Sequence, residues 1–146
     1  MLNEQVSEFV LNGTIPSKKN SRVNLPTGVS VPNNKFVQWQ DDAIVEVRRQ
    51  TRQRYMGFVQ IELILYFATL GRADTDNKVT SILDMLVAGM VLKDDYWESV
   101  VKTSYEAAYR PGKPGAFVRI TPMPRDFFGD EYIAAAAKRD KRKRLP

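Results

Sequence analysis

The chain has 146 residues, enough for one compact domain with a single hydrophobic core. It contains no His and no Cys, which excludes disulfides, zinc sites built on those residues, and catalytic triads that use either side chain. The net charge of +5 lies at the end of the chain: residues 138–144 hold six Lys or Arg and one Asp, and the other residues are balanced. Such a tail favours contact with nucleic acid, although a solvated chain end has the same composition.

The hydrophobic pattern predicts an ordered series of elements. Residues 7–11 predict a short strand, and the polar stretch after it predicts a loop that extends through Asn34. Helical spacing of apolar residues predicts a helix over residues 36–54, and strict alternation predicts a strand over 58–68. After a loop at 71–77, a second helix is expected to end near residue 91. Residues 100–109 and 117–121 predict a hairpin, and Asp130 is expected to cap a short helix that ends at Ala137.

This order predicts an α+β domain in which two main helices pack on a small mixed β-sheet, followed by a basic C-terminal helix or tail. We place the main domain at residues 1–125 and the C-terminal helix and tail at residues 126–146. No basic segment followed by an apolar stretch opens the chain, and the longest apolar run, residues 85–92, is too short to cross a bilayer. We therefore expect a cytoplasmic protein without a membrane partner.

Acidic residues lie on either side of the second predicted helix. Asp74 and Asp76 follow the strand at 58–68, Asp84 lies about two helical turns after Asp76, and Asp94 and Asp95 follow the helix. A return of the chain to the neighbouring strand would bring Asp95 beside Asp74 and Asp76. Clustered carboxylates repel one another unless a cation holds them, and oxygen ligands without His or Cys favour Mg²⁺ or Mn²⁺. Such an ion activates water and stabilises the leaving oxygen in phosphodiester cleavage.

The same residues also have structural interpretations. Asp74 or Thr75 is suited to cap the second helix, and Asp76 suits the first turn of that helix. Asp94 and Asp95 are equally typical of a solvated turn.

Three segments, in this order, resemble the RusA family of Holliday-junction resolvases. They are residues 74–77 (Asp-Thr-Asp-Asn), 82–86 (Ile-Leu-Asp-Met-Leu) and 93–95 (Lys-Asp-Asp). Residues 16–20 (Pro-Ser-Lys-Lys-Asn) are similar to the early loop of that family, and the resemblance covers residues 9–121. It implies a bacterial or phage-encoded crossover junction endodeoxyribonuclease of RusA-like fold. Such a protein is a homodimer that nicks four-way DNA junctions with Mg²⁺, leaves a 5′-phosphate and a 3′-hydroxyl, and needs no nucleotide cofactor.

The resemblance assigns metal-binding and catalytic roles to Asp74, Asp76 and Asp95. The family also has a Lys four residues after the second Asp, where this chain has Thr80. Lys78 is our candidate for the missing cation, although a regular helix points it away from Asp76.

Other cations are further candidates for that charge: Lys93, Lys18, Lys19 and Arg72. For DNA contact we select Lys18, Lys19 and Asn20 in the early loop, together with Arg72. The sequence does not locate the dimer interface, for which the exposed side of the strand around Gln60 and the hairpin are both candidates.

Two other functions stay open on the sequence. In the first, the protein binds junctions and cuts weakly or not at all, because the cation at position 80 is missing. In the second, the protein is a small structural or adaptor domain whose acidic residues only cap a helix.

Overall fold

The computed structural model describes residues 4–17, 22–32 and 34–144 of the chain. Its helices and strands are β1 (Ser7–Asn12), β2 (Arg22–Asn24), β3 (Ser30–Pro32), α1 (Asn34–Gln50), β4 (Val59–Phe67), α2 (Thr75–Ala88), β5 (Val100–Tyr109), β6 (Gly115–Pro122) and α3 (Asp130–Lys143). The predicted α+β class is confirmed. None of the described helices is both long enough and apolar enough to cross a membrane.

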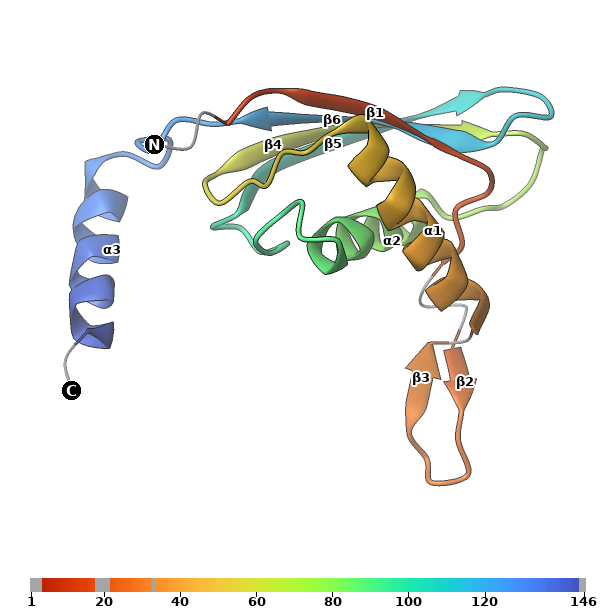
Figure 1. The fold of residues 1–146 in the computed structure, drawn as a ribbon, viewed down its shortest axis with the longest axis horizontal. Helices are drawn as coiled ribbons and strands as arrows, with labels where there is room; N and C mark the ends of the chain where they lie inside the picture. Colours follow the sequence, from red (N-terminus) through yellow and green to blue (C-terminus); the bar gives the residue numbers. More distant parts are fainter. Residues whose placement is uncertain (1–3, 18–21, 33, 145–146) are drawn as a thin grey trace.

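Four strands form the main sheet in the order β1-β6-β4-β5. The β1–β6 and β4–β6 pairs are antiparallel, whereas β4 and β5 are parallel. A parallel pair needs a crossover connection, and α2 supplies it between β4 and β5. The start of α2 therefore follows one end of β4, and the loop after α2 leads back to the start of β5. Figure 1 shows α1 and α2 on one side of the sheet, while the opposite face has no helix over it.

Apolar side chains between the sheet and the two helices make the core. The alternation in β4 buries one face of the strand, as its period of two requires. The buried core residues come from β1, α1, β4, α2 and β6 and from the segments beside them: Phe9, Leu11, Ile15, Ala43, Val47, Tyr55, Val59, Ile61, Leu63, Leu65, Val79, Ile82, Met85, Leu86, Val91, Leu92, Ala116, Val118 and Ile120. This core fixes α2, and hence the acidic residues at its ends, against the sheet.

Three predicted boundaries were wrong. The polar stretch predicted as loop contains a small hairpin, in which β2 pairs with β3 across a turn with Gly28 at φ +85°. Helix α1 ends at Gln50, four residues before the predicted end. Residues 51–54 are not helical, and Tyr55 after them forms an isolated parallel bridge to Leu92. Helix α3 continues to Lys143, because acidic residues in its first turn and basic residues in its last turn suit the helix dipole.

Candidate active site

The turn between β4 and α2 places Asp74 at the helix N-cap. Its backbone is extended, and its carboxylate accepts hydrogen bonds from the Asp76 N–H at 2.9 Å and from the Asn77 side-chain amide at 3.3 Å. The capping interpretation of Asp74 is therefore confirmed. The cap keeps the Asp74 carboxylate at an exposed helix N-terminus, where the helix dipole favours negative charge. An anionic group at this position is also open to a cation from solvent.

Asp76 lies in the first turn of α2 and meets a tyrosine from the sheet. The Tyr105 hydroxyl, from the middle of β5, donates a hydrogen bond to Oδ1 of Asp76. This bond, helped by the charges of Asp76 and Asp74, raises the pKa of the Tyr105 hydroxyl above its ordinary value. Tyr105 thereby holds Asp76 through one of its two carboxylate oxygens. Sequence reasoning missed this contact, because only the parallel pairing of β4 with β5 brings the middle of β5 beside the start of α2.

The loop after α2 carries the second group of acidic residues. The Lys93 N–H donates to the Tyr55 carbonyl at 3.2 Å, and the Asp95 N–H donates to Oδ1 of Asp94 at 2.8 Å. Partial burial is the main cause that raises the pKa of the Asp95 carboxyl. A hydrogen bond with Asp94 and the negative charges of Asp84 and Asp94 add to this effect. Asp95 thus lies within the electrostatic reach of two other carboxylates.

The acidic residues form two groups, one at each end of α2. Asp74 and Asp76 lie at its start, whereas Asp84, Asp94 and Asp95 lie toward its end. Asp76 and Asp84 are eight residues apart, which is about 12 Å along a helix axis. Within residues 4–17, 22–32 and 34–144, no three acidic side chains are placed to hold one metal ion together. The shared site of Asp74, Asp76 and Asp95 therefore stays a prediction.

The donor chemistry of both groups nevertheless fits a hard divalent cation. The side-chain atoms in these groups that could bind a metal are oxygens of Asp, Asn and Tyr105. The chain has no His or Cys, the residues that would favour a softer metal. Burial is the main cause of the raised pKa of Asp95, and a bound cation would offset the smaller contribution from the charges of Asp84 and Asp94.

Lys78 points away from the acidic residues. Its ammonium donates to the Ile15 carbonyl at 2.6 Å and lies 5.9 Å from the centre of the Phe67 ring. Burial lowers the pKa of the Lys78 ammonium. At the position of the family's Lys, Thr80 instead donates to the Asp76 carbonyl at 3.0 Å. A catalytic role for Lys78 stays a prediction.

The predicted DNA contacts come from two loops, residues 18–20 and the loop that holds Arg72. Lys18, Lys19 and Asn20 fall outside the described residues. The segment that leads to them is fixed on α2, because the buried Ser81 hydroxyl bonds to the Pro16 carbonyl at 2.7 Å and Lys78 holds Ile15. Arg72, two residues before Asp74, is exposed in the loop between β4 and α2.

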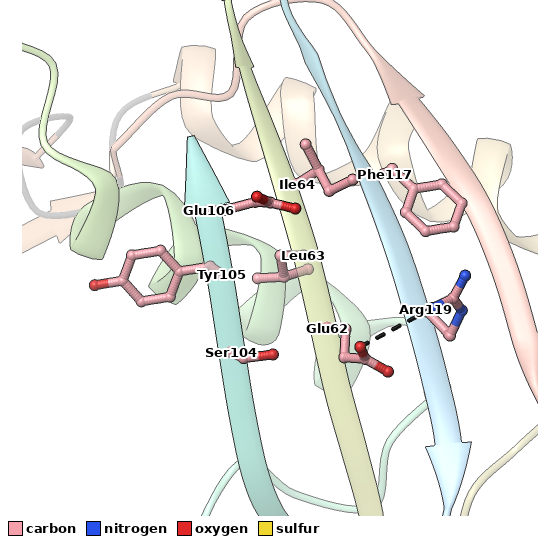
Figure 2. A pocket seen from close by; sticks show the side chains of 8 residues that line it. All are labelled: Glu62, Leu63, Ile64, Ser104, Tyr105, Glu106, Phe117 and Arg119. Atoms are coloured by element: carbon pink, nitrogen blue, oxygen red, sulfur yellow. Dashed lines mark ion pairs between the residues drawn. The ribbon is translucent and has the colours of Figure 1, made fainter. Parts of the chain in front are cut away.

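The uncovered face of the sheet has a shallow hollow of its own. Figure 2 shows the residues that line it, from β4, β5 and β6: Glu62, Leu63, Ile64, Ser104, Tyr105, Glu106, Phe117 and Arg119. By strand register, Leu63 and Tyr105 share the opposite, helix-covered face, so the other six provide the side chains of the uncovered face. Arg119 forms ion pairs with Glu8 at 3.4 Å and with Glu62 at 3.9 Å, so much of the charge on this face is paired. Gln60 is on the same strand and shares the parity of Glu62 and Ile64. This strand surface is one of the two candidates for a dimer interface, and the homodimer stays a prediction.

Comparison with known proteins gives one family match. The model of the family described as endodeoxyribonuclease RusA matches residues 12–121, about three quarters of the chain. The matched segment runs from the end of β1 to β6, includes both acidic groups, and ends before α3. A search of the curated proteins found no match.

Proposed function

The chain belongs to the RusA endodeoxyribonuclease family, and on that premise we propose that it resolves four-way DNA junctions by paired, symmetric, Mg²⁺-dependent nicks. The observation that carries the proposal is the pair of acidic groups at the two ends of α2, inside the matched segment and open to solvent. Among the described residues, no Lys or Arg lies within ion-pair distance of Asp74, Asp76 or Asp95. Uncompensated carboxylates of this kind suit a catalytic cation better than a structural network.

Asp74, Asp76 and Asp95 are the residues that we propose hold the Mg²⁺, with Mn²⁺ as a substitute. The bound ion supplies Lewis-acid stabilisation of charge on the scissile phosphate and acidifies water. Tyr105 orients the Asp76 carboxylate by occupying one of its oxygens. The cap that Asp74 forms keeps the two carboxylates on the same turn of chain. In this scheme each acidic residue has a structural contact that positions it and a carboxylate that binds the ion.

A cation near these carboxylates would stabilise the negative charge that develops on the phosphate. For Lys78 this role requires its ammonium to exchange the Ile15 carbonyl for a phosphate oxygen. Lys18, Lys19, Asn20 and Arg72 are the proposed contacts to the DNA backbone. Two symmetric nicks need two sites, and a two-fold homodimer supplies them.

Mapping of the nicks tests this proposal. A four-way junction labelled on each strand in turn is incubated with Mg²⁺ and wild-type protein, Asp95→Asn or the control Asp42→Asn. Asp42 is an exposed carboxylate on α1, so the control removes the same charge outside the acidic groups. We expect symmetric nicks with ends that DNA ligase reseals for the wild type and the control, and none for Asp95→Asn. Asymmetric cuts, or equal cutting by all three proteins, would overturn the proposal.

Thr80 gives a specific reason for a second candidate function, a junction-binding protein that cuts weakly or not at all. Its hydroxyl is engaged with the Asp76 carbonyl, at the position where the resemblance implies a Lys. Tight junction binding by a folded wild-type protein, without nicking in Mg²⁺ or Mn²⁺ across a range of pH, would establish this alternative.

A further inference from the structure

Helix α3 is an addition to the matched family segment. It begins after Gly129 and therefore lies beyond residue 121, where the family match ends. Figure 1 shows it standing off one end of the sheet, apart from α1 and α2. No residue of α3 is buried. Core packing therefore does not explain why a helix forms here, and its contacts with the rest of the domain are confined to one side.

One of those contacts is a carboxylate clamp at Glu98. The Glu98 carboxylate accepts a hydrogen bond from the Tyr132 hydroxyl at 2.9 Å and from Nη1 of Arg139 at 2.6 and 2.8 Å. Tyr132 and Arg139 are seven residues apart, so both lie on the same face of α3. The Glu98 side chain is only 14% exposed. Since Glu98 follows Asp95 by three residues, the clamp fixes α3 to the loop that carries the second acidic group.

The base of α3 is also held by an aromatic cluster, which we define as Phe58, Trp97, Phe127, Phe128 and Tyr132. Its ring pairs are mostly edge-to-face, with centroids 5.0 to 5.9 Å apart. The rings come from the segment before β4, the loop after α2, the turn before α3, and the first turn of α3. The aromatic cluster and the Glu98 clamp, which share Tyr132, therefore fix the direction of the helix together.

Three cations of α3 lie outside the clamp face, along one flank of the helix. At 100° per residue, Arg142, Lys138 and Lys141 lie about 70°, 110° and 170° around the helix from the face shared by Tyr132 and Arg139. All three are exposed, and none has an acidic partner within ion-pair distance among the described residues. Lys138 and Arg142 are four residue steps apart, or about 6 Å along the helix, which is close to two phosphate steps of one DNA strand.

We propose that α3 is a docked basic arm that binds the phosphate backbone of a duplex arm of the branched substrate, and that Glu98 is the residue that positions this arm on the Asp95 loop. The proposal rests on the proposed function for the identity of the substrate. The polyanion is the occupant that the surface fits, because residues 138–144 hold the whole net charge of the chain and Lys138, Lys141 and Arg142 have no ion-pair partner among the described residues.

The test of the arm measures binding, not cutting. Junction affinity is measured by fluorescence anisotropy at several salt concentrations in chelator, for wild type, for Lys138→Gln/Lys141→Gln/Arg142→Gln, and for a matched control. The control, Lys35→Gln/Arg52→Gln/Lys113→Gln, removes the same charge from exposed positions elsewhere in the domain.

We expect the α3 variant to weaken binding about tenfold and to lower the slope of log affinity against log salt by about 2 to 3, while the control changes affinity less than about threefold. Equal losses in the two variants would overturn the proposal. If the α3 variant loses affinity as expected and the wild type never cuts, the arm stands and the proposed function fails. If the wild type cuts and the α3 variant binds like the control, the arm fails and the proposed function stands.

The positioning role of Glu98 has its own readout, because Trp97 lies against Phe128 and Tyr132. Glu98→Gln should shift the tryptophan emission to longer wavelength and weaken junction binding about threefold, although Lys138, Lys141 and Arg142 are unchanged. The exchanged pair Glu98→Arg/Arg139→Glu should restore both values. A Glu98→Gln protein with wild-type emission and wild-type affinity would refute the positioning role of Glu98. The role would also be refuted if the exchanged pair folds like the wild type by circular dichroism but restores neither the emission nor the affinity.

Discussion

Replacing Tyr55 by Phe tests the hydrogen bonds that tie the start of β1 to the segment before β4. The Tyr55 ring is 1% exposed, and its hydroxyl bonds to Ser7 Oγ at 2.6 Å and donates to the Gln5 carbonyl. Ser7 in turn bonds to the Thr51 hydroxyl at 2.8 Å. The donor order Thr51 to Ser7 to Tyr55 to the Gln5 carbonyl satisfies every one of these groups.

The expected loss follows from what the substitution leaves behind. Each neutral hydrogen bond contributes about 0.5–1.5 kcal/mol, so two lost bonds correspond to about 1–3 kcal/mol. Ser7 keeps its bond to Thr51, and the exposed Gln5 exchanges its lost bond for water, which places the expected loss near 1.5 kcal/mol. The ring stays in place, so no cavity forms. For a chain of this length, the melting temperature should fall by about 5 °C.

Urea unfolding, followed by circular dichroism, measures this loss. The control is Tyr109→Phe, which removes a hydroxyl from an exposed ring and should change the free energy of unfolding by less than about 0.5 kcal/mol. A Tyr55→Phe protein as stable as this control would refute the hydrogen-bond argument. A loss above about 4 kcal/mol would refute the premise that the ring packing is unchanged.

Three further predictions concern α2 and α3. Met90→Gly should raise the free energy of unfolding by about 1 kcal/mol in urea, because Met90 is 58% exposed at φ +62°, where glycine adopts the backbone without strain. Unchanged or lower stability would contradict this. The Arg139 guanidinium lowers the pKa of Glu98, so the docking of α3 should be complete above the ordinary Glu pKa and be lost as the pH falls through the lowered value. Tryptophan emission titrated from about pH 6 to about pH 2 measures this, and a Glu98→Gln protein with the same transition would contradict it. Thr80→Lys should raise the nicking rate about tenfold on a labelled junction, whereas Thr80→Gln, without the charge, should not.

The elements that could be predicted from the sequence are those whose apolar residues recur at the spacing of a strand or a helix. Strand β4 alternates strictly and α2 carries a continuous apolar stripe, so both were predicted within a few residues of their ends. The β2–β3 hairpin has only three residues in each strand and a polar composition, which leaves no alternation to detect. The full length of α3 was missed because its basic half resembles a solvated tail unless its clamp to Glu98, 41 residues earlier than Arg139, is known.

The candidate site was likewise predicted only in part from the sequence. The acidic residues around α2 were found because Asp74, Asp76 and Asp95 are visible as short clusters in the sequence. Their partners were not found: the bond from Tyr105 to Asp76 joins residues 29 positions apart and depends on strand register. The electrostatic effect of Asp84 on Asp95 likewise depends on the path of the loop after α2.

The most direct test of the catalytic role proposed for α2 compares nicking of a labelled four-way junction with that of its linear duplex. Wild type and Asp76→Asn are assayed with Mg²⁺ and with chelator, each shown by circular dichroism to be folded. Nicking that is confined to the junction and requires both Mg²⁺ and Asp76 is the predicted result. Wild-type cutting by Asp76→Asn, or cutting that continues in chelator, would contradict a catalytic metal site at the start of α2.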